Sequence, residues 1–218
     1  MSEKLIVIGD VHGCACELED LLAKISPSRG DRVLLLGDLV NRGPNSHRVV
    51  RIAREGGFRS LIGNHELRLL NYRRHQDPSV LKPYDYQTLQ QLTREDWDFI
   101  GGMKAFHETD DSEFVCVHGG FVPGQPWRTQ SIDTVCQAKW IPPEAIPPGK
   151  RRGRNSIHWS ELWDGPATVL YGHTPDPEIR FSPHALGIDT ACVYGGFLTA
   201  CVLPAVEFVR IKARKAYI

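Results

Sequence analysis

The sequence carries no surplus of either charge. Its 26 Lys and Arg residues balance 26 Asp and Glu residues, which gives a formal net charge of 0. Proteins that a general basic field holds on nucleic acid have a clear excess of Lys and Arg. We therefore expect no stable nucleic-acid partner, although a local basic cleft is compatible with this balance.

Long hydrophobic runs and paired cysteines are also missing. No segment approaches the ~18 apolar residues of a membrane span, and the opening "MSEKLIVIGD" lacks a signal-peptide core. The six cysteines show no C-x-x-C spacing, so reduced thiols are favoured over a disulfide framework. These absences predict a cytoplasmic protein with no membrane partner, and they leave the oligomeric state open.

Apolar runs and amphipathic segments alternate along the 218 residues. "KLIVIGD", "DRVLLLGD" and "FRSLIGNHE" read as strands, and the segments 14–25 and 46–57 between them read as helices. This β-α-β-α-β order predicts a parallel sheet covered by helices. The polar stretch 67–110 reads as mostly helical, "EFVCVHGG" and "ATVLYGHTP" as further strands, and the C-terminal part as antiparallel strands. We expect one domain over 1–218, with a Pro/Gly-rich lid or insert at about 119–158.

Each predicted strand ends in residues that can bind a metal. In α/β sheets, sites form outside the carboxyl ends of the strands, so these residues should converge. Oxygen and imidazole ligands without thiolate suit Mn²⁺, Fe or Zn²⁺. Six ligands exceed the needs of one catalytic metal with an open position, which favours two metals that share a carboxylate. The candidate ligands are Asp10, His12, Asp38, Asn64, His118 and His173.

Asp38 is the candidate bridge between the two metals. Asp10 and His12 would complete one metal site, and the remaining three ligands would complete the other. Any one of these motifs alone is compatible with an ordinary turn or a buried structural histidine. Their occurrence in order, each at a strand end, indicates a dinuclear site.

The blocks "GDVHG", "GDLVNRGP", "GNHE", "VHGG" and "GHTP", between Gly9 and Pro175, resemble the signature of the calcineurin-like metallophosphoesterases. The resemblance implies an α/β fold, a four-layer α-β-β-α sandwich of two mixed sheets with a dimetal site at the strand ends. It implies the same six ligands and two divalent cations, with Mn²⁺ favoured and Fe, Zn²⁺ or Co²⁺ as alternatives. The implied reaction is attack of an activated water on phosphorus.

The resemblance also implies roles for individual residues. Arg42 and Asn64 would bind the substrate phosphate, since a planar guanidinium matches phosphate oxygens. His65 matches the general acid of the family, which protonates the leaving oxygen, and Asp38 bridges the metals. Glu66 is expected to begin a helix rather than to act on substrate.

Asn41 departs from the Ser/Thr phosphatase branch, which typically reads GDxVDRG and pairs its second aspartate with the histidine of GNHE. An amide can accept a hydrogen bond but lacks the charge that raises a histidine pKa, so His65 should be a weaker acid. A phosphate leaving group, with a last pKa of about 6, needs little protonation. The sequence therefore predicts a preference for phosphoanhydrides, unless Asn41 is only a steric replacement.

"GDLVNRGP", "VHGGFVPG" and "WSELWDGP" resemble the branch that contains bacterial symmetrical bis(5'-nucleosyl)-tetraphosphatase and its ApaH-like relatives. We expect a metal-dependent phosphohydrolase that acts on a phosphorylated small molecule or nucleotide, with a (di)nucleoside polyphosphate as the favoured substrate. The alternatives are a Ser/Thr phosphoprotein phosphatase or broad phosphomonoesterase, a polyphosphatase, an RNA-cap hydrolase, and a catalytically silent scaffold.

The insert offers further candidates for substrate contact. Trp127 and Trp140 could stack on a base, whereas Trp159 and Trp163 are expected to pack in the core. The basic cluster "KRRGR" at 150–154 is either a solvated face or a contact for distal phosphates.

Overall fold

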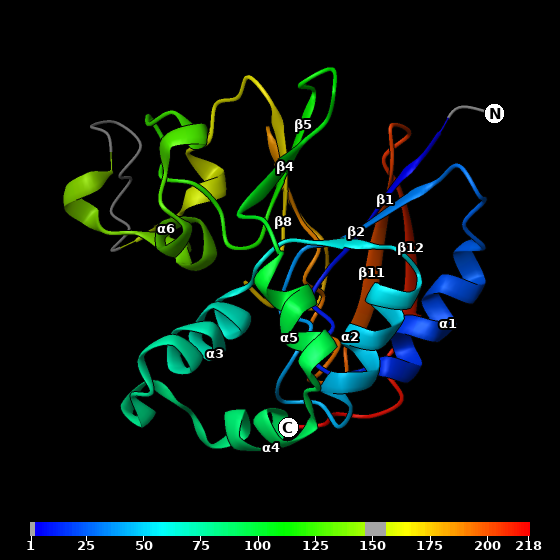
Figure 1. The fold of residues 1–218 in the computed structure, drawn as a ribbon. Helices are drawn as coiled ribbons and strands as arrows, with labels where there is room; N and C mark the ends of the chain where they lie inside the picture. The colour runs from blue at the N-terminus through cyan, green and yellow to red at the C-terminus, as the bar shows by residue number, and fades with distance from the viewer. Residues whose placement is uncertain (1–2, 147–155) are drawn as a thin grey trace.

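The computed structural model describes residues 3–146 and 156–218 and shows four layers (Figure 1). A layer of helices covers one face of a first sheet, a second sheet packs on the other face, and the insert covers the far side of the second sheet. This arrangement confirms the predicted α-β-β-α sandwich with two mixed sheets. The basic cluster at 150–154 lies outside the described residues.

The first sheet has five strands in the order β12-β11-β1-β2-β3. Its strands are β1 (Leu5–Ile8), β2 (Arg32–Leu35), β3 (Arg59–Ser60), β11 (Phe197–Leu203) and β12 (Glu207–Lys212). β1, β2 and β3 run parallel, as the β-α-β-α-β order predicts, while β11 is antiparallel to both β1 and β12. β3 is short because the chain leaves the sheet there: Leu61 N–H donates to Leu35 C=O, and Ile62 N–H donates to Lys104 C=O.

The second sheet has the order β4-β5-β8-β10-β9. Its strands are β4 (Phe106–Glu108), β5 (Phe114–Val117), β8 (Thr168–Tyr171), β9 (Arg180–Ser182) and β10 (Ala185–Gly187). The stretch 67–110 is mostly helical, as predicted, and β4, which pairs antiparallel with β5, is its exception. Three residues are too few for a periodic signal, so only pairing with β5 makes this segment a strand.

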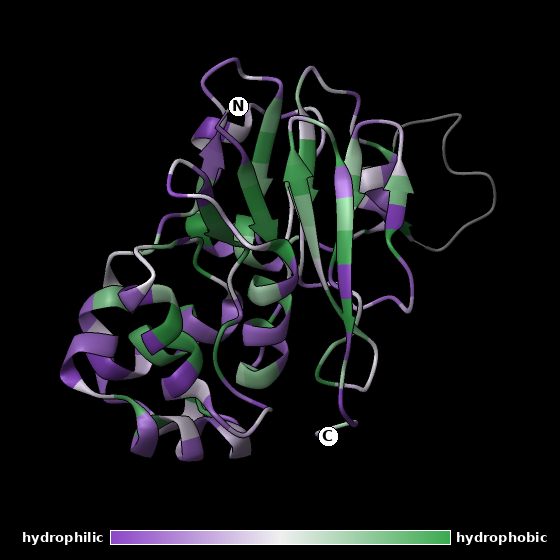
Figure 2. Cartoon of the chain, turned by 90° about the vertical axis from the view of Figure 1, so that its right-hand side faces the viewer, coloured by the Kyte–Doolittle hydropathy of each residue, from purple (hydrophilic) through white to green (hydrophobic). Residues whose placement is uncertain are grey.

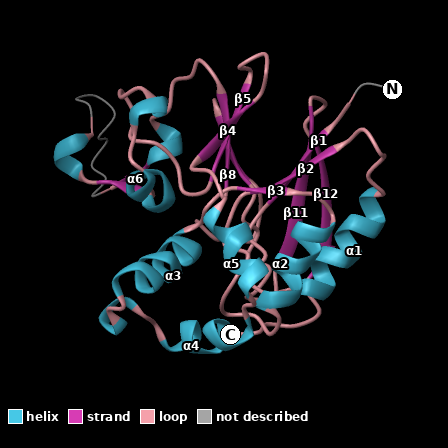
Figure 3. Ribbon diagram, viewed as in Figure 1, coloured by secondary structure: helices cyan, strands magenta, loops and turns pink. Residues whose placement is uncertain are grey.

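The helices lie mainly on one side and at one end of the sheets, whereas α6 lies in the insert (Figure 3). They are α1 (Ala15–Ile25), α2 (Ser46–Glu55), α3 (Asn64–His75), α4 (Pro83–Gln91), α5 (Arg94–Gly101) and α6 (Ile132–Gln137). Short 3-10 turns are η1 (Pro78–Val80), η2 (Trp127–Thr129), η3 (Pro143–Ala145) and η4 (Trp159–Glu161). No helix in the described ranges is both long and apolar enough to cross a bilayer.

Alternation along β1 divides the core. Ile6 and Ile8 face the helix layer, while Leu5 and Val7 face the second sheet and meet a cluster that includes Leu170. Successive strand side chains point to opposite faces, so a strand buried on both faces must be apolar throughout. Figure 2 shows these strands as predominantly hydrophobic and the outer faces of the helices as hydrophilic. Both sheets therefore hold their strand ends rigidly at the same edge.

The described part of the insert is a packed layer rather than a loose lid. Phe121, Trp159 and Trp163 are buried against the outer face of the second sheet. A short two-stranded sheet of β6 (Trp140–Ile141) and β7 (Ile157–His158) stands beside them. The expectation that Trp159 and Trp163 pack in the core is confirmed.

Candidate metal centre and active site

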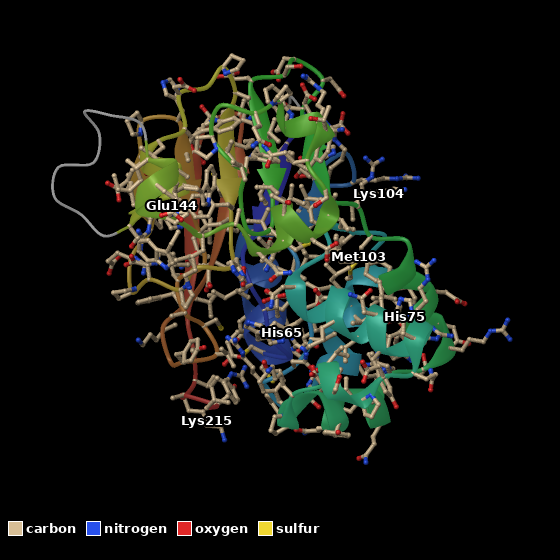
Figure 4. The ribbon with its side chains drawn as sticks, turned by 90° about the vertical axis from the view of Figure 1, so that its left-hand side faces the viewer. His65, His75, Met103, Lys104, Glu144 and Lys215 are labelled. Carbon is tan, nitrogen blue, oxygen red and sulfur yellow. The ribbon has the colours of Figure 1, made fainter. Side chains whose placement is uncertain are left out.

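Segments far apart in the sequence deliver their polar residues to one place. Asp10 and His12 follow β1, Asp38 follows β2, Asn64 begins α3, and two more histidines, His118 and His173, follow β5 and β8. His65, beside Asn64, lies in the interior of the molecule, whereas His75 and Lys104 lie at its periphery (Figure 4). The strand ends thus form a single polar cluster inside an otherwise apolar framework.

Asp38 stands at the centre of this cluster. Its Oδ2 lies 3.4 Å from His12 Nε2, and its Oδ1 lies 3.4 Å from His118 Nε2. Within the described residues, two groups have ligand atoms within 4.8 Å of one another: His12, Asp38 and His65, and Asp38, His118 and His173. Asp38 belongs to both groups, which is the geometry that a bridging ligand requires.

Asn64 joins the second group. Its Oδ1 lies 3.1 Å from His118 Nε2 and 2.9 Å from His173 Nδ1. Asn64, His118 and His173, which the sequence assigns to one metal, therefore each place one possible ligand atom close to the other two. Asp38 lies at the same point through its Oδ1.

Asp10 is held differently. Both of its oxygens accept the backbone N–H of His173 at 3.1 Å, and it is not in either of the two compact groups. A Cβ on Gly172 would lie 2.1 Å from Asp10 Oδ1, so only glycine admits the carboxylate there. Asp10 therefore contacts the backbone of His173. The sequence assigns Asp10 to the same metal as His12, but the third member of the compact group with His12 and Asp38 is His65.

The tautomers of two histidines show that the cluster is built to bind cations. His12 Nδ1 lies 3.0 Å from Val40 C=O, and His118 Nδ1 lies 3.0 Å from Leu36 C=O. A carbonyl only accepts, so each Nδ1 carries the proton and each Nε2 turns a lone pair toward Asp38. Lone pairs facing a carboxylate repel unless a cation lies between them. The donor set therefore fits divalent cations.

Burial sets the ionisation of these groups. Desolvation raises the pKa of Asp38 to about 7 and lowers the pKa of His12 and of His118 to about 3. The pKa of Asp10 is raised well above its usual value by burial and by the charges of Asp189 and Asp38. Neutral imidazole is the form that binds metals, and a bound cation would favour ionised carboxylates.

The backbone of the site is strained. His12, Asp38, Asn41, Arg42 and His173 all have positive φ, between 46° and 71°. Such conformations are uncommon for residues with a side chain, and each costs about 1–3 kcal/mol unless the surroundings impose it. The site geometry is therefore held by the rest of the fold and not by local preference.

Glu66 is one of the groups that impose this geometry. Its Oε1 accepts the N–H groups of Leu39 and Val40 at 2.8 and 3.1 Å, and its Oε2 accepts those of Asp38 and Gly63 at 2.9 and 3.0 Å. The expected start of a helix is correct, since α3 begins at Asn64. The clamp on the Asp38 loop is a second role, which sequence reasoning missed.

His65 Nδ1 faces donors and not a carboxylate. Asn41 Nδ2 lies 2.9 Å from it and Arg68 Nη2 lies 3.2 Å from it. Asp85 Oδ1 accepts from Asn41 Nδ2 at 2.7 Å, which fixes the orientation of the amide. The amide therefore donates to the histidine, whereas the sequence analysis gave it the acceptor role. Two donors at Nδ1 keep the His65 proton on Nε2, on the metal-facing side.

Asp85 and Arg68 were missed by sequence reasoning. Asp85 is fully buried and accepts from Arg68 Nε and Nη2 at 2.8 and 3.0 Å. Pro83 followed by an acid two positions later does predict a helix start. Nothing in that local signal indicates that α4 would bring the acid against Asn41.

Arg42 is oriented by two tyrosines. Its Nη1 donates to Tyr194 OH at 2.8 Å, and its guanidinium carbon lies 5.9 and 5.6 Å from the ring centres of Tyr84 and Tyr194. The same Nη1 lies 3.4 Å from His12 Nε2. The arginine therefore stands beside the metal-binding cluster, held between aromatic rings. Neither tyrosine carried a sequence signal.

The chain belongs to the calcineurin-like phosphoesterase family, whose model matches residues 3–202. Members of this family are hydrolases of phosphoric ester or anhydride bonds that use a dinuclear divalent metal site. The prediction of a metal-dependent phosphohydrolase is confirmed at this level.

Three relatives show where in the family the chain lies. It is 30% identical to the asymmetrical bis(5'-nucleosyl)-tetraphosphatase PrpE of Halalkalibacterium halodurans over 96% of this chain and 94% of that protein. It is 27% identical to the enzyme of the same name from Oceanobacillus iheyensis over 99% of this chain and 94% of the relative. A crystal structure described as "a putative diadenosine tetraphosphatase" superposes with a TM-score of 0.83 at 28% identity, covering 98% and 95% of the two chains. The two PrpE relatives are named asymmetrical, whereas the sequence motifs resemble the branch that contains the symmetrical enzyme.

Proposed function

We propose that this protein hydrolyses a phosphoanhydride bond of dinucleoside polyphosphates such as diadenosine tetraphosphate, as a cytoplasmic enzyme. The names of its relatives support this substrate class. The observation that carries the proposal is the surroundings of His65, whose Nδ1 faces Asn41 Nδ2 and Arg68 Nη2.

Six residues would hold two cations. Asp38 would be shared, His12 and Asp10 would serve one cation, and the trio of Asn64, His118 and His173 would serve the other. Mn²⁺ suits this mixture of oxygen and imidazole ligands, with Fe, Zn²⁺ and Co²⁺ as alternatives. When bound, such a pair lowers the pKa of water and stabilises negative charge on phosphoryl oxygens.

Arg42 would bind the phosphate under attack. It lies next to His12, and its guanidinium is always charged and offers two parallel donors. Tyr84 and Tyr194 restrict its motion, so little entropy is lost when the phosphate binds. Asn64, whose Oδ1 faces the second group of ligands, leaves its amide nitrogen for a phosphoryl oxygen.

His65 would assist the leaving group from Nε2. With a donor on each approach to Nδ1, the ring is neutral and its Nε2–H donates a hydrogen bond rather than a full proton. A nucleotide leaves through a phosphate group whose last pKa is about 6, so a hydrogen bond is enough to assist its departure. A serine alkoxide needs protonation and would leave slowly from this site.

We infer the position of cleavage from the names of the relatives. An asymmetrical enzyme splits diadenosine tetraphosphate into AMP and ATP, and a symmetrical one produces two ADP. Because the two relatives above are named asymmetrical, we propose AMP and ATP as products.

The deciding experiment measures kcat/KM with Mn²⁺ on diadenosine tetraphosphate, p-nitrophenyl phosphate and a phosphoserine peptide, with separation of the nucleotide products. A preference for the dinucleotide over the phosphoserine peptide of at least about a hundredfold is expected, since the neutral histidine penalises only the substrate with an alkoxide leaving group. A preference for the peptide would overturn the proposal and make the protein a phosphoprotein phosphatase. Two ADP would leave the substrate class intact and reject the cleavage position.

A further inference from the structure

A cavity of about 630 Å³ lies in the insert beside the site. Its walls are largely apolar and include Trp140, Ile141 and Leu162. Its polar groups include Lys139, Gln137 and Asp164. A volume in this range, apolar walls and a few polar groups are typical of small-molecule sites.

Gln137 connects this cavity with the metal-binding cluster. It lines the cavity and also a smaller pocket of about 240 Å³ whose wall includes Asn64 and Arg68. Asn64 is a candidate metal ligand, and Arg68 contacts His65. Gln137 and the smaller pocket therefore link the large cavity to the candidate ligand Asn64.

Trp140, which also lines the cavity, connects it with the metal-binding cluster through other residues. The Trp140 ring meets the His158 ring at 5.4 Å, edge to face, and His158 Nε2 lies 3.4 Å from Thr174 Oγ1. Thr174 follows His173 in the chain. The Lys139 ammonium makes no hydrogen bond or ion pair with any described residue, and its charge is among those that lower the pKa of His173. Lys139 thus lines the cavity with no counter-ion among the described residues, and its charge reaches His173.

The cavity has a fixed position relative to the metal ligands. Gly119 N–H and Gly120 N–H, just after His118, donate to Val135 C=O in α6 at 2.8 and 3.1 Å. Cys136 Sγ donates to Ile62 C=O at 3.2 Å. The wall that α6 supplies is therefore anchored to the segments that follow β3 and β5.

Trp140 differs from Trp127, the other candidate for base contact. Trp127 is buried and packs on Trp163 with a ring-centre distance of 6.1 Å. Trp140 keeps 51% of its surface exposed and lines the cavity. An exposed indole at the mouth of an apolar cavity offers a free face for a flat ring.

We propose that this cavity binds one nucleoside of the substrate, with the purine stacked on Trp140 and the adjoining phosphates paired with Lys139. The inference rests on the proposed function and deepens it by naming a nucleoside subsite. Asp164 and Gln137 supply acceptors for an exocyclic amine of the base. The phosphate chain would then run past Lys139 and Gln137 to the cluster around Asp38.

The test separates base from phosphate. Trp140→Leu and Lys139→Gln are titrated with AMP, ATP and tripolyphosphate by calorimetry, and KM is measured for diadenosine tetraphosphate. Trp140→Leu should weaken AMP and ATP binding about tenfold and leave tripolyphosphate unchanged, because only nucleotides have a base to stack. Lys139→Gln should weaken ATP and tripolyphosphate by about fivefold or more. In both variants KM for the dinucleotide should rise, with kcat changed by less than about twofold.

Two control variants match these changes. Phe181→Leu removes another exposed aromatic ring, on β9, and Lys104→Gln removes a lysine that points outward at the periphery (Figure 4). Neither should alter nucleotide binding. Thermal unfolding of each variant checks that the fold is intact.

If Trp140→Leu binds AMP and ATP as tightly as the wild type does, the inference is wrong, even if the enzyme prefers dinucleotides. Loss of activity on p-nitrophenyl phosphate in the same variant would also overturn it, because that substrate has no nucleoside. If the wild type binds AMP through Trp140 but shows no preference for anhydrides, the subsite stands and the proposed function fails. The two failures are therefore distinguishable.

Discussion

The side-chain amide of Asn41 donates a hydrogen bond of 2.7 Å to the buried carboxylate of Asp85. This contact decides which way the amide faces and therefore what it presents to His65. It also changes what the Asn41→Asp substitution tests. In that variant two buried carboxylates would meet, and Arg68 would have to compensate both of them.

We therefore predict that Asn41→Asp alone lowers the free energy of unfolding by about 2 kcal/mol, through repulsion of like charges. The paired variant Asn41→Asp with Asp85→Asn should recover most of that loss, because the amide and the carboxylate only exchange places. Its activity on a phosphoserine peptide relative to diadenosine tetraphosphate should rise at least about tenfold, since His65 then gains an anionic partner. An unchanged ratio in a stable paired variant would refute the leaving-group argument.

Asp38→Asn should reduce kcat/KM by more than about a thousandfold, because the shared carboxylate is lost from both ligand groups. Elemental analysis should show the metal content falling from near two per chain. Asp110→Asn, at an exposed acid, is the matched control and should keep both metal and activity. Full activity in Asp38→Asn would exclude Asp38 as the bridge.

Arg42→Lys should lower kcat/KM about a hundredfold, because a lysine cannot supply two parallel donors or the same contact with the tyrosine rings. Tyr194→Phe removes only the 2.8 Å hydrogen bond to Arg42 and should cost about fivefold. Tyr86→Phe, at an exposed tyrosine on α4, serves as the control. Equal loss in Tyr194→Phe and Arg42→Lys would mean that Tyr194 does more than orient the guanidinium.

Glu66→Gln should destabilise the protein by about 2–3 kcal/mol in urea unfolding, because one glutamine NH₂ must face backbone N–H groups that now donate to the carboxylate. The Asp38 loop should loosen, so metal affinity should fall as well. Glu55→Gln, at the exposed end of α2, is the matched substitution and should leave stability within about 0.5 kcal/mol. Wild-type stability in Glu66→Gln would show that the clamp does not hold the loop.

Both the strands and the candidate ligands could be predicted from the sequence, because each ligand closely follows an apolar run. Apolar runs such as "KLIVIGD" identify buried strands, and polar residues at their ends must bind something or be solvated. β4 was not predictable, because three residues form a strand there only through pairing with β5. The burial of Phe121 and Trp127 in the insert was not predictable, because a Pro/Gly-rich composition does not show which side chains pack.

The sequence by itself determined the chemistry: which side chains could bind cations, which guanidinium could bind phosphate, and that an amide replaces an aspartate at position 41. Those are properties of residue type and of position relative to a strand end. Only the tertiary structure decided that Asn41 donates to His65, since its orientation depends on Asp85, 44 positions away in the chain. It also decided that Trp140 is exposed while Trp127 is buried, because packing between elements, and not local sequence, sets the exposure of a side chain.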